Sequence, residues 1–185
     1  MNKELFYIPN LLSIARMVLV LPLSYLLIFH FEEQKGLIIT IMSVMYVTDL
    51  LDGYIARKFN QVSELGKKID PLADKVTVVA VTIILFFKGL IPVFFFLVII
   101  LRDILILAFG IYIEKTRNIT LMSNVWGKAA VLGIGIILLL TVINFEYFNA
   151  FLNIFYYIVL ILITLSLIFY YIRFKKTIGE KIYGC

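Results

Sequence analysis

Six long apolar stretches dominate the chain, at residues 8–31, 36–57, 70–87, 90–113, 121–143 and 148–173. Each is close to the roughly 20 residues that a helix needs to cross the hydrocarbon core of a bilayer. Segments that span a membrane in this way are helical, because an open strand would leave its backbone N–H and C=O groups unpaired in lipid. We therefore expect an all-α integral membrane protein, with six transmembrane helices in a single domain over residues 1–185.

The composition excludes several other classes of protein. The chain is 63% hydrophobic and 16% charged, whereas a soluble domain is about 45–50% apolar and about 25% charged. Disordered chains are poor in apolar residues, so disorder is excluded as well. One cysteine, Cys185, and one histidine, His30, argue against a disulfide scaffold and against a metal centre built from those residue types.

Lysine and arginine are distributed unevenly between the segments that connect the stretches. Six spanning helices place both termini on one side, and the segments of that side carry eleven of these residues, against Lys35 and Lys88 on the other. The positive-inside rule then predicts a multi-pass protein of the cytoplasmic membrane with both termini in the cytoplasm. The same residues account for most of the net charge of +5, so we do not expect a nucleic-acid partner.

Aspartate occurs only in or at the ends of the apolar stretches. A charge at the centre of a spanning helix costs about 2.5–3.5 kcal/mol on insertion scales, so charges retained there mark a functional site. We expect a polar cavity among the helices, open to the cytoplasmic side. The five residues concerned are Asp49, Asp52, Asp70, Asp74 and Asp103.

Four of these aspartates form two pairs at helical spacing. Asp49 and Asp52 are three residues apart, and Asp70 and Asp74 are four apart, so each pair shares one face of its helix. We expect the two helices to be antiparallel neighbours, so that the four carboxylates can converge near the cytoplasmic boundary. Oxygen ligands suit Mg²⁺, Mn²⁺ or Ca²⁺, and two such ions together are suited to phosphoryl transfer. The alternative is that nearby Arg or Lys neutralises each pair without a metal.

Small and basic residues accompany the two pairs at fixed spacing. The segment reads Asp49-Leu-Leu-Asp52-Gly53-Tyr-Ile-Ala56-Arg57, then eight residues, then Gly66-Lys-Lys-Ile-Asp70-Pro-Leu-Ala-Asp74. This pattern resembles the signature of the CDP-alcohol phosphatidyltransferase family. The run Ile8-Pro9-Asn10-Leu-Leu-Ser13-Ile-Ala-Arg16 looks like the N-terminal segment of that family, and the six-helix layout is similar.

The resemblance implies a reaction, two cofactor ions and a role for each matched residue. In this family, CDP-diacylglycerol in the bilayer gives its phosphatidyl group to an acceptor alcohol, which is small and polar or is itself a lipid. CMP leaves, and the enzyme is a homodimer. Two ions, Mg²⁺ or Mn²⁺, would be ligated by the four aspartates, with Asp74 also acting as the catalytic base. The residues implied for binding CDP are Gly53, Ala56, Arg57 and Gly66. Helix packing is the alternative for Gly53, and a membrane anchor is the alternative for Arg57.

The acceptor alcohol has three candidates. The segments 8–10 and 66–75 look most like phosphatidylglycerophosphate synthases, whose acceptor is glycerol 3-phosphate. Arg102-Asp103 looks more like cardiolipin synthases, whose acceptor is phosphatidylglycerol, and phosphatidylinositol phosphate synthases are the third candidate. The cations expected to bind a phosphorylated acceptor are Arg102, Lys128, Lys67 and Arg16. The alternative for Arg102 is a local ion pair with Asp103, and for Lys128 a cation at a helix end.

Two further interpretations stay open. Asn10, Ser13 and Arg16 are expected to line the nucleotide or acceptor pocket, with helix capping and helix contact as the alternatives for Asn10 and Ser13. Carboxylates within a membrane also mark ion pathways, so a divalent-cation or proton-coupled transporter is a distant alternative. Two features oppose it: the carboxylates cluster near one boundary, and no inverted repeat relates the two halves.

Overall fold

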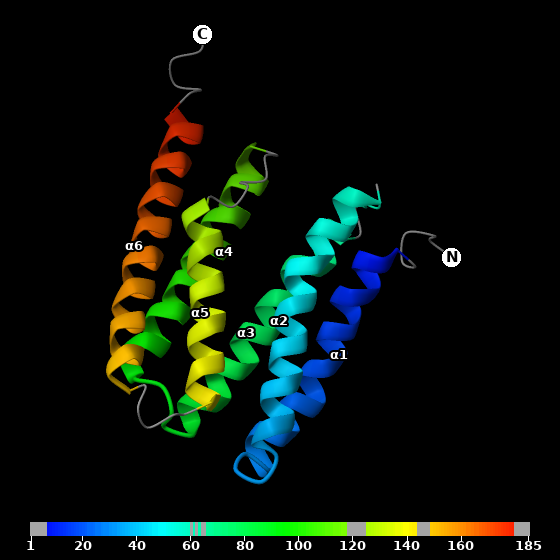
Figure 1. Ribbon diagram of the computed structural model, residues 1–185. Helices are drawn as coiled ribbons and strands as arrows, with labels where there is room; N and C mark the ends of the chain where they lie inside the picture. Colours follow the sequence, from blue (N-terminus) through cyan, green and yellow to red (C-terminus); the bar gives the residue numbers. More distant parts are fainter. Residues whose placement is uncertain are drawn as a thin grey trace. The chain divides into compact units, whose positions relative to one another are not determined.

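The computed structural model describes residues 7–59, 61, 63, 66–117, 125–143 and 149–179. These residues form six α-helices and no strand, which confirms the predicted all-α class (Figure 1). The helices are α1 (Ile8–Phe29), α2 (Lys35–Lys58), α3 (Gly66–Phe87), α4 (Val93–Arg117), α5 (Val125–Ile143) and α6 (Asn149–Gly179).

Five of the six helices are long and apolar enough to cross a membrane, the exception being α3. The first ten residues of α3 carry five charges, while its remainder, residues 76–87, carries none. Large apolar side chains are exposed along the helices, including Leu21 on α1 at 72% and Leu97 on α4 at 57%. Apolar exposure on this scale is untypical of a soluble monomer and suits contact with lipid. The chain is a multi-pass membrane protein.

The helix boundaries differ from the predicted ones mainly at the cytoplasmic ends that we assigned. Helix α3 begins at Gly66 rather than at Asp70, and Pro71 therefore lies inside the helix. Helices α4 and α6 continue to Arg117 and Gly179, several residues past the apolar stretches that predicted them. A helix need not end where hydrocarbon ends, because its backbone hydrogen bonds are internal to the segment. Residues 121–124 and 148 of the predicted spans lie outside the described residues.

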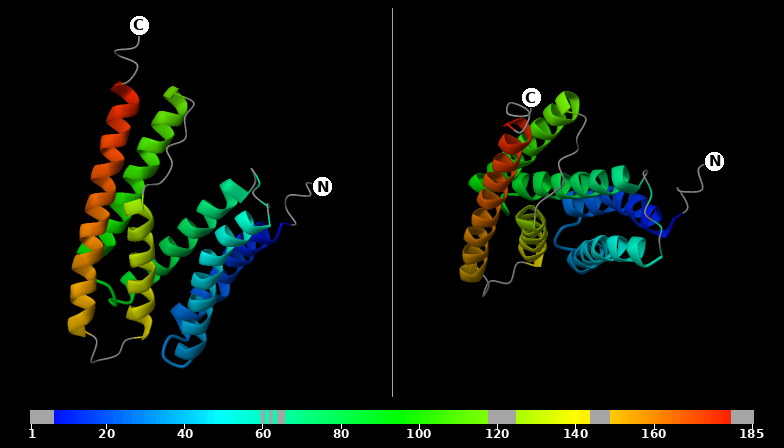
Figure 2. Two further views of the ribbon diagram at one scale, coloured as in Figure 1. Left: turned by 45° about the horizontal axis from the view of Figure 1, so that its top comes forward. Right: turned by 90° about the horizontal axis from the view of Figure 1, so that it is seen from above.

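The chain divides into two compact units, and the first contains the predicted site. This unit comprises Met1–Ile91 with Leu138–Asn144. Within it α1 packs along both α2 and α3, and the right-hand view of Figure 2 shows α1 between the other two. The structure brings aspartates of α2 and α3 within reach of one another, although both helices pack most extensively against α1. Helix α1 provides the surface that both of them share.

The second unit comprises Pro92–Ile137 with Phe145–Cys185, and α4 packs against α6 within it. The buried ring of Phe95 on α4 meets Tyr156 on α6 edge to face, with 4.6 Å between centroids. Helices α5 and α6 approach closely at Gly133, where an added Cβ would lie 2.7 Å from a methyl group of Val159. The structure divides into two units, so the expected single domain over residues 1–185 stays a prediction.

Candidate functional site

Arg16, in the third turn of α1, is the centre of a group of charges in the first unit. Its side chain is 2% exposed and makes ion pairs with all four aspartates of the two predicted pairs. Nη1 donates to Oδ1 of Asp49 at 2.5 Å and to Oδ1 of Asp74, and Nη2 donates to Oδ2 of Asp52. Nη1 also lies 3.8 Å from Oδ1 of Asp70. One guanidinium thus links α1 to both of the helices that flank it.

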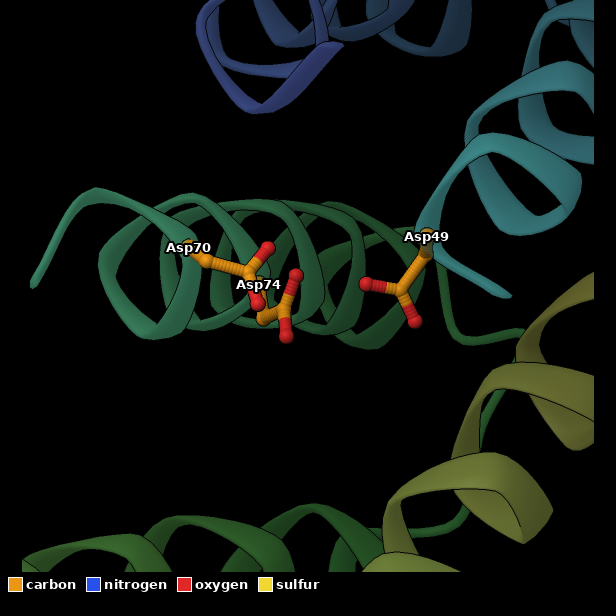
Figure 3. A group of neighbouring side chains, drawn as sticks. All are labelled: Asp49, Asp70 and Asp74. Carbon is orange, nitrogen blue, oxygen red and sulfur yellow. The ribbon is translucent and has the colours of Figure 1, made fainter. Parts of the chain in front are cut away.

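The four aspartates, which we call the acidic cluster, converge as their spacing predicted. One carboxylate oxygen from each of Asp49, Asp70 and Asp74 lies within 4.8 Å of the other two. Figure 3 shows these side chains extending from α2 and α3 toward a common space. Their side chains are 28%, 41% and 33% exposed, so an ion or substrate can reach them. Asp52 is 5% exposed and joins the cluster through Arg16.

A stripe of buried polar residues on α1 faces the cluster. Asn10, Ser13 and Arg16 follow one another at intervals of three, which places them on one face of the helix. The Ser13 hydroxyl lies 3.2 Å from Oδ1 of Asp70 and 3.1 Å from the carbonyl oxygen of Pro9. A hydroxyl has one proton to donate, and a charged acceptor forms the stronger bond. Ser13 therefore orients Asp70. The structure shows the helix contact that was the alternative interpretation of Ser13.

Asn10 and Gly66 meet at the start of α3. Asn10 Nδ2 donates to Oγ of Ser63 at 2.9 Å, and the same oxygen accepts the backbone N–H of Gly66 at 2.9 Å. Ser63 Oγ thus accepts the first N–H of α3, one of the backbone donors that have no carbonyl partner within the helix. A Cβ added to Gly66 would collide with Oδ1 of Asn10 and would lie 3.0 Å from Oγ of Ser63. Gly66 therefore has a packing role here.

The other residues implied for CDP binding lie mostly beyond what the structure describes. Gly53, Arg57 and Lys67, the last of which was implied for acceptor binding, are described only by their backbones, which belong to α2 and α3. Ala56 lies on α2, one turn past Asp52, and is partly exposed. Their roles stay predictions.

The cations Arg102 and Lys128 belong to the second unit. Arg102 is 6% exposed on α4, and its Nη1 donates to Oδ1 of Asp103 at 2.8 Å. Its Nη2 lies 3.4 Å from the carbonyl oxygen of Gly127, the residue before Lys128. The local ion pair with Asp103, which was the alternative interpretation of Arg102, is therefore present. Lys128 is exposed near the start of α5. Binding of an acceptor by either residue stays a prediction.

The donor set of the acidic cluster fits a hard divalent cation. Carboxylate oxygens are the ligands that Mg²⁺ and Mn²⁺ prefer, and three of them lie close enough together to share one ion. Arg16 pairs with all four of these carboxylates, so its one positive charge offsets one of their four formal negative charges. Three formal negative charges among these five side chains remain to be compensated, which favours added cations.

Sequence reasoning missed two partners within the site. Arg16 was assigned to the nucleotide or acceptor pocket, whereas the structure places it on the metal-binding aspartates that we predicted. The available signal was its position in an apolar helix, where an arginine requires an acidic partner. Ser63 was not considered, although a serine three residues before Gly66 is the spacing of a helix cap.

Comparison with known proteins identifies relatives over most of the chain. The sequence matches the family described as CDP-alcohol phosphatidyltransferase over residues 6–172. It is 35% identical to the CDP-diacylglycerol–glycerol-3-phosphate 3-phosphatidyltransferase of Aquifex aeolicus over 181 residues, which cover 94% of this chain and 99% of the relative.

Other relatives match over a shorter region. The chain is 43% identical to the cardiolipin synthase (CMP-forming) of Rattus norvegicus and 41% identical to that of Homo sapiens. Each of these matches extends over 108 residues, which cover 58% of this chain and 35% of the relative. The chain thus spans about a third of the length of these two relatives.

Proposed function

We propose that this chain, which belongs to the CDP-alcohol phosphatidyltransferase family, transfers the phosphatidyl group of CDP-diacylglycerol to glycerol 3-phosphate and releases CMP. The observation that carries the proposal is the convergence of Asp49, Asp70 and Asp74, with an oxygen of each within 4.8 Å of the others. Such a group of carboxylates on a membrane protein suits a reaction in which a diphosphate is cleaved beside a lipid.

The acidic cluster is proposed to hold two divalent ions, Mg²⁺ or Mn²⁺. Asp49, Asp70 and Asp74 would supply ligands from their mutually close oxygens, and Asp52 would supply one from the buried side of the cluster. When bound, the ions would supply positive charge that neutralises the diphosphate and the departing CMP.

The reaction proposed at this cluster is a displacement at phosphorus. The acceptor hydroxyl oxygen forms a bond to the phosphorus that carries diacylglycerol, and the bond from that phosphorus to the bridging oxygen breaks. The bridging oxygen leaves with CMP. Asp74 accepts the hydroxyl proton as the general base, and its partly exposed carboxylate gives an acceptor access to it. Ser13 holds Asp70, and in the metal-free protein Arg16 links α1 to both α2 and α3.

The nucleotide and the lipid are proposed to bind on the cytoplasmic side of the bilayer. Gly53, Ala56 and Arg57 follow Asp52 along α2 and would contact the CDP moiety, with Gly66 shaping the start of α3 beside them. The acyl chains can stay in the hydrocarbon region while the diphosphate reaches the cluster. This orientation places both termini in the cytoplasm, and the protein is expected to act as a homodimer.

Glycerol 3-phosphate is the acceptor that the comparisons favour most. The relative from Aquifex aeolicus bears that substrate in its name and matches this chain nearly from end to end. Lys128, Arg102 and Lys67 are the cations proposed to attract or bind such a dianion. Phosphatidylglycerol is the second candidate, favoured by the 43% identity to a cardiolipin synthase over 108 residues and by the sequence Arg102-Asp103.

An acceptor panel separates these activities. Purified protein in detergent micelles is given CDP-diacylglycerol and Mn²⁺ with one acceptor at a time: glycerol 3-phosphate, phosphatidylglycerol, inositol phosphate, inositol or serine. We expect CMP release and a phosphatidylglycerophosphate product with glycerol 3-phosphate. Product formed only with phosphatidylglycerol would move the assignment to the second candidate. Cation flux through proteoliposomes without CMP release under any condition would instead support a transporter.

A further inference from the structure

Arg16 touches the same oxygen atoms that would ligate a metal ion. Its Nη1 is paired with Oδ1 of Asp49, Oδ1 of Asp70 and Oδ1 of Asp74. These three residues are the ones whose oxygens lie within 4.8 Å of one another. A divalent ion bound among them would sit at about 2.0–2.2 Å from its oxygen ligands. The guanidinium nitrogen and the ion therefore require overlapping positions.

Electrostatics makes the two cations competitors as well as neighbours. Arg16 is 2% exposed, so water does little to screen it from a second positive charge. A like charge within a few ångströms opposes binding of another cation, whereas the four carboxylates attract either one. A single guanidinium leaves three of their formal charges uncompensated, and a divalent ion compensates more of them.

The guanidinium is also not fully satisfied where it lies. Arg16 Nε is buried and has no hydrogen-bond partner among the described residues, although Nη1 and Nη2 both donate to carboxylates. A buried donor without a partner lowers stability. Movement of the side chain that brings Nε to water or to an anion removes this cost, so part of the energy lost on leaving the carboxylates is recovered.

We infer that Arg16 is the resident counter-ion of the metal-free acidic cluster, and that a divalent ion binds by displacing its guanidinium from Asp49 and Asp74. The inference rests on the proposed function, because that proposal assigns the metal ions to this cluster. In the metal-free protein Arg16 keeps four carboxylates on two helices assembled against their mutual repulsion. The ion then enters a cluster whose geometry is already formed.

We call this replacement of the guanidinium by a metal ion the exchange. Removing the charge of Arg16 tests it by metal binding alone, with no need for turnover. Wild type, Arg16→Gln and Arg16→Lys are prepared as full chains in detergent, and Mn²⁺ alone is titrated while free Mn²⁺ is followed by its electron paramagnetic resonance signal. We expect Arg16→Gln to bind Mn²⁺ about tenfold more tightly, since a like charge at this range shifts an ionic equilibrium by one or more powers of ten. Lys88→Gln, which removes an exposed cation of the first unit just past the end of α3, is the control and should leave Mn²⁺ affinity unchanged.

Thermal unfolding supplies a second readout. Without metal, Arg16→Gln should unfold at a lower temperature than wild type, and saturating Mn²⁺ should raise its unfolding temperature by more than it raises that of wild type. If Arg16→Gln does not fold, Arg16→Lys decides the matter, because an ammonium group lacks the planar fork of donors with which the guanidinium reaches carboxylates on both helices, and it should compete less. Mn²⁺ affinity equal to or weaker than that of wild type in the folded variant overturns the inference.

The outcomes also distinguish this inference from the proposed function. Equal Mn²⁺ affinity in wild type and variant, together with normal CMP release by wild type, overturns the exchange and leaves the proposed function intact. Binding of Mn²⁺ by Arg16→Gln but not by wild type would show that the guanidinium blocks the cluster and is not displaced, which overturns the exchange. Absence of Mn²⁺ binding in both proteins contradicts the metal centre itself, and the exchange with it.

Discussion

The Ser13 hydroxyl on α1 lies 3.2 Å from Oδ1 of Asp70 on α3, a hydrogen bond between residues 57 positions apart. This bond fixes the direction of one carboxylate of the acidic cluster. Partners that orient a metal ligand typically contribute about 10–100-fold to metal affinity.

Ser13→Ala should therefore raise the Mn²⁺ concentration that gives half-maximal CMP release by about tenfold. Thr40→Ala is the matched control, because it also removes a hydroxyl, but one that bonds only to the Gly36 carbonyl on an exposed part of α2. An unchanged Mn²⁺ requirement in Ser13→Ala would show that this hydroxyl does not orient the ligand.

Asp74→Asn should remove most turnover. A positioned general base contributes about 10²–10⁴-fold to rate, so kcat should fall by at least two orders of magnitude. Mn²⁺ should still bind, because the carboxylates of Asp49, Asp52 and Asp70 remain. The control is Glu33→Gln, which neutralises an exposed carboxylate paired with His30 and should keep wild-type kcat. Wild-type turnover by Asp74→Asn would contradict the assignment of the base.

Gly66→Ala should destabilise the first unit. The added Cβ would collide with the buried Asn10 side chain, and overpacking of this kind lowers the free energy of unfolding by about 1–3 kcal/mol. Gly36→Ala is the control, since no atom lies within 4 Å of its added Cβ and a helical alanine is no less stable than glycine. Chemical denaturation in mixed micelles measures both.

A double variant tests whether the collision with Asn10 causes the lower stability of Gly66→Ala. Asn10→Ala in the Gly66→Ala background makes room for the new methyl group, so the two changes together should cost less than the sum of the single changes. Additive costs would mean that the collision with Asn10 does not explain the loss.

Lys128→Gln should weaken the binding of a phosphorylated acceptor. Hydrogen bonds to charged groups contribute about 1.5–3 kcal/mol, so KM for glycerol 3-phosphate should rise about tenfold while KM for CDP-diacylglycerol stays constant. Lys115→Gln removes another exposed lysine of the second unit and serves as the control. Equal KM values in the two variants would assign Lys128 to the helix end alone.

The lengths of the apolar stretches predicted the helices well, because a helix that crosses the bilayer needs an apolar segment of about the length of the hydrocarbon core. It predicted helix ends less well, since hydrogen bonding decides where a helix stops. The Ser63 hydroxyl accepts the first N–H of α3 at Gly66, four residues before Asp70, and α6 continues to Gly179 through polar residues. Such hydrogen bonds depend on contacts outside the apolar pattern.

Helical spacing predicted that the aspartates meet, but not what lies between them. Intervals of three and four residues fix which side chains share a face, and Asp49 and Asp74 do converge. Spacing within a helix says nothing about which helix packs beside it. The place of α1 between α2 and α3, and hence the pairing of Arg16 with both aspartate pairs, is a property of the packing.

The most direct test of the metal-centre assignment is CMP release from CDP-diacylglycerol and glycerol 3-phosphate, measured before and after chelation of divalent ions. We predict that the chelator abolishes release by wild type, that excess Mg²⁺ or Mn²⁺ restores it, and that Asp49→Asn stays inactive after restoration. Release that persists at an unchanged rate in the chelator, or full activity of Asp49→Asn, would contradict the account.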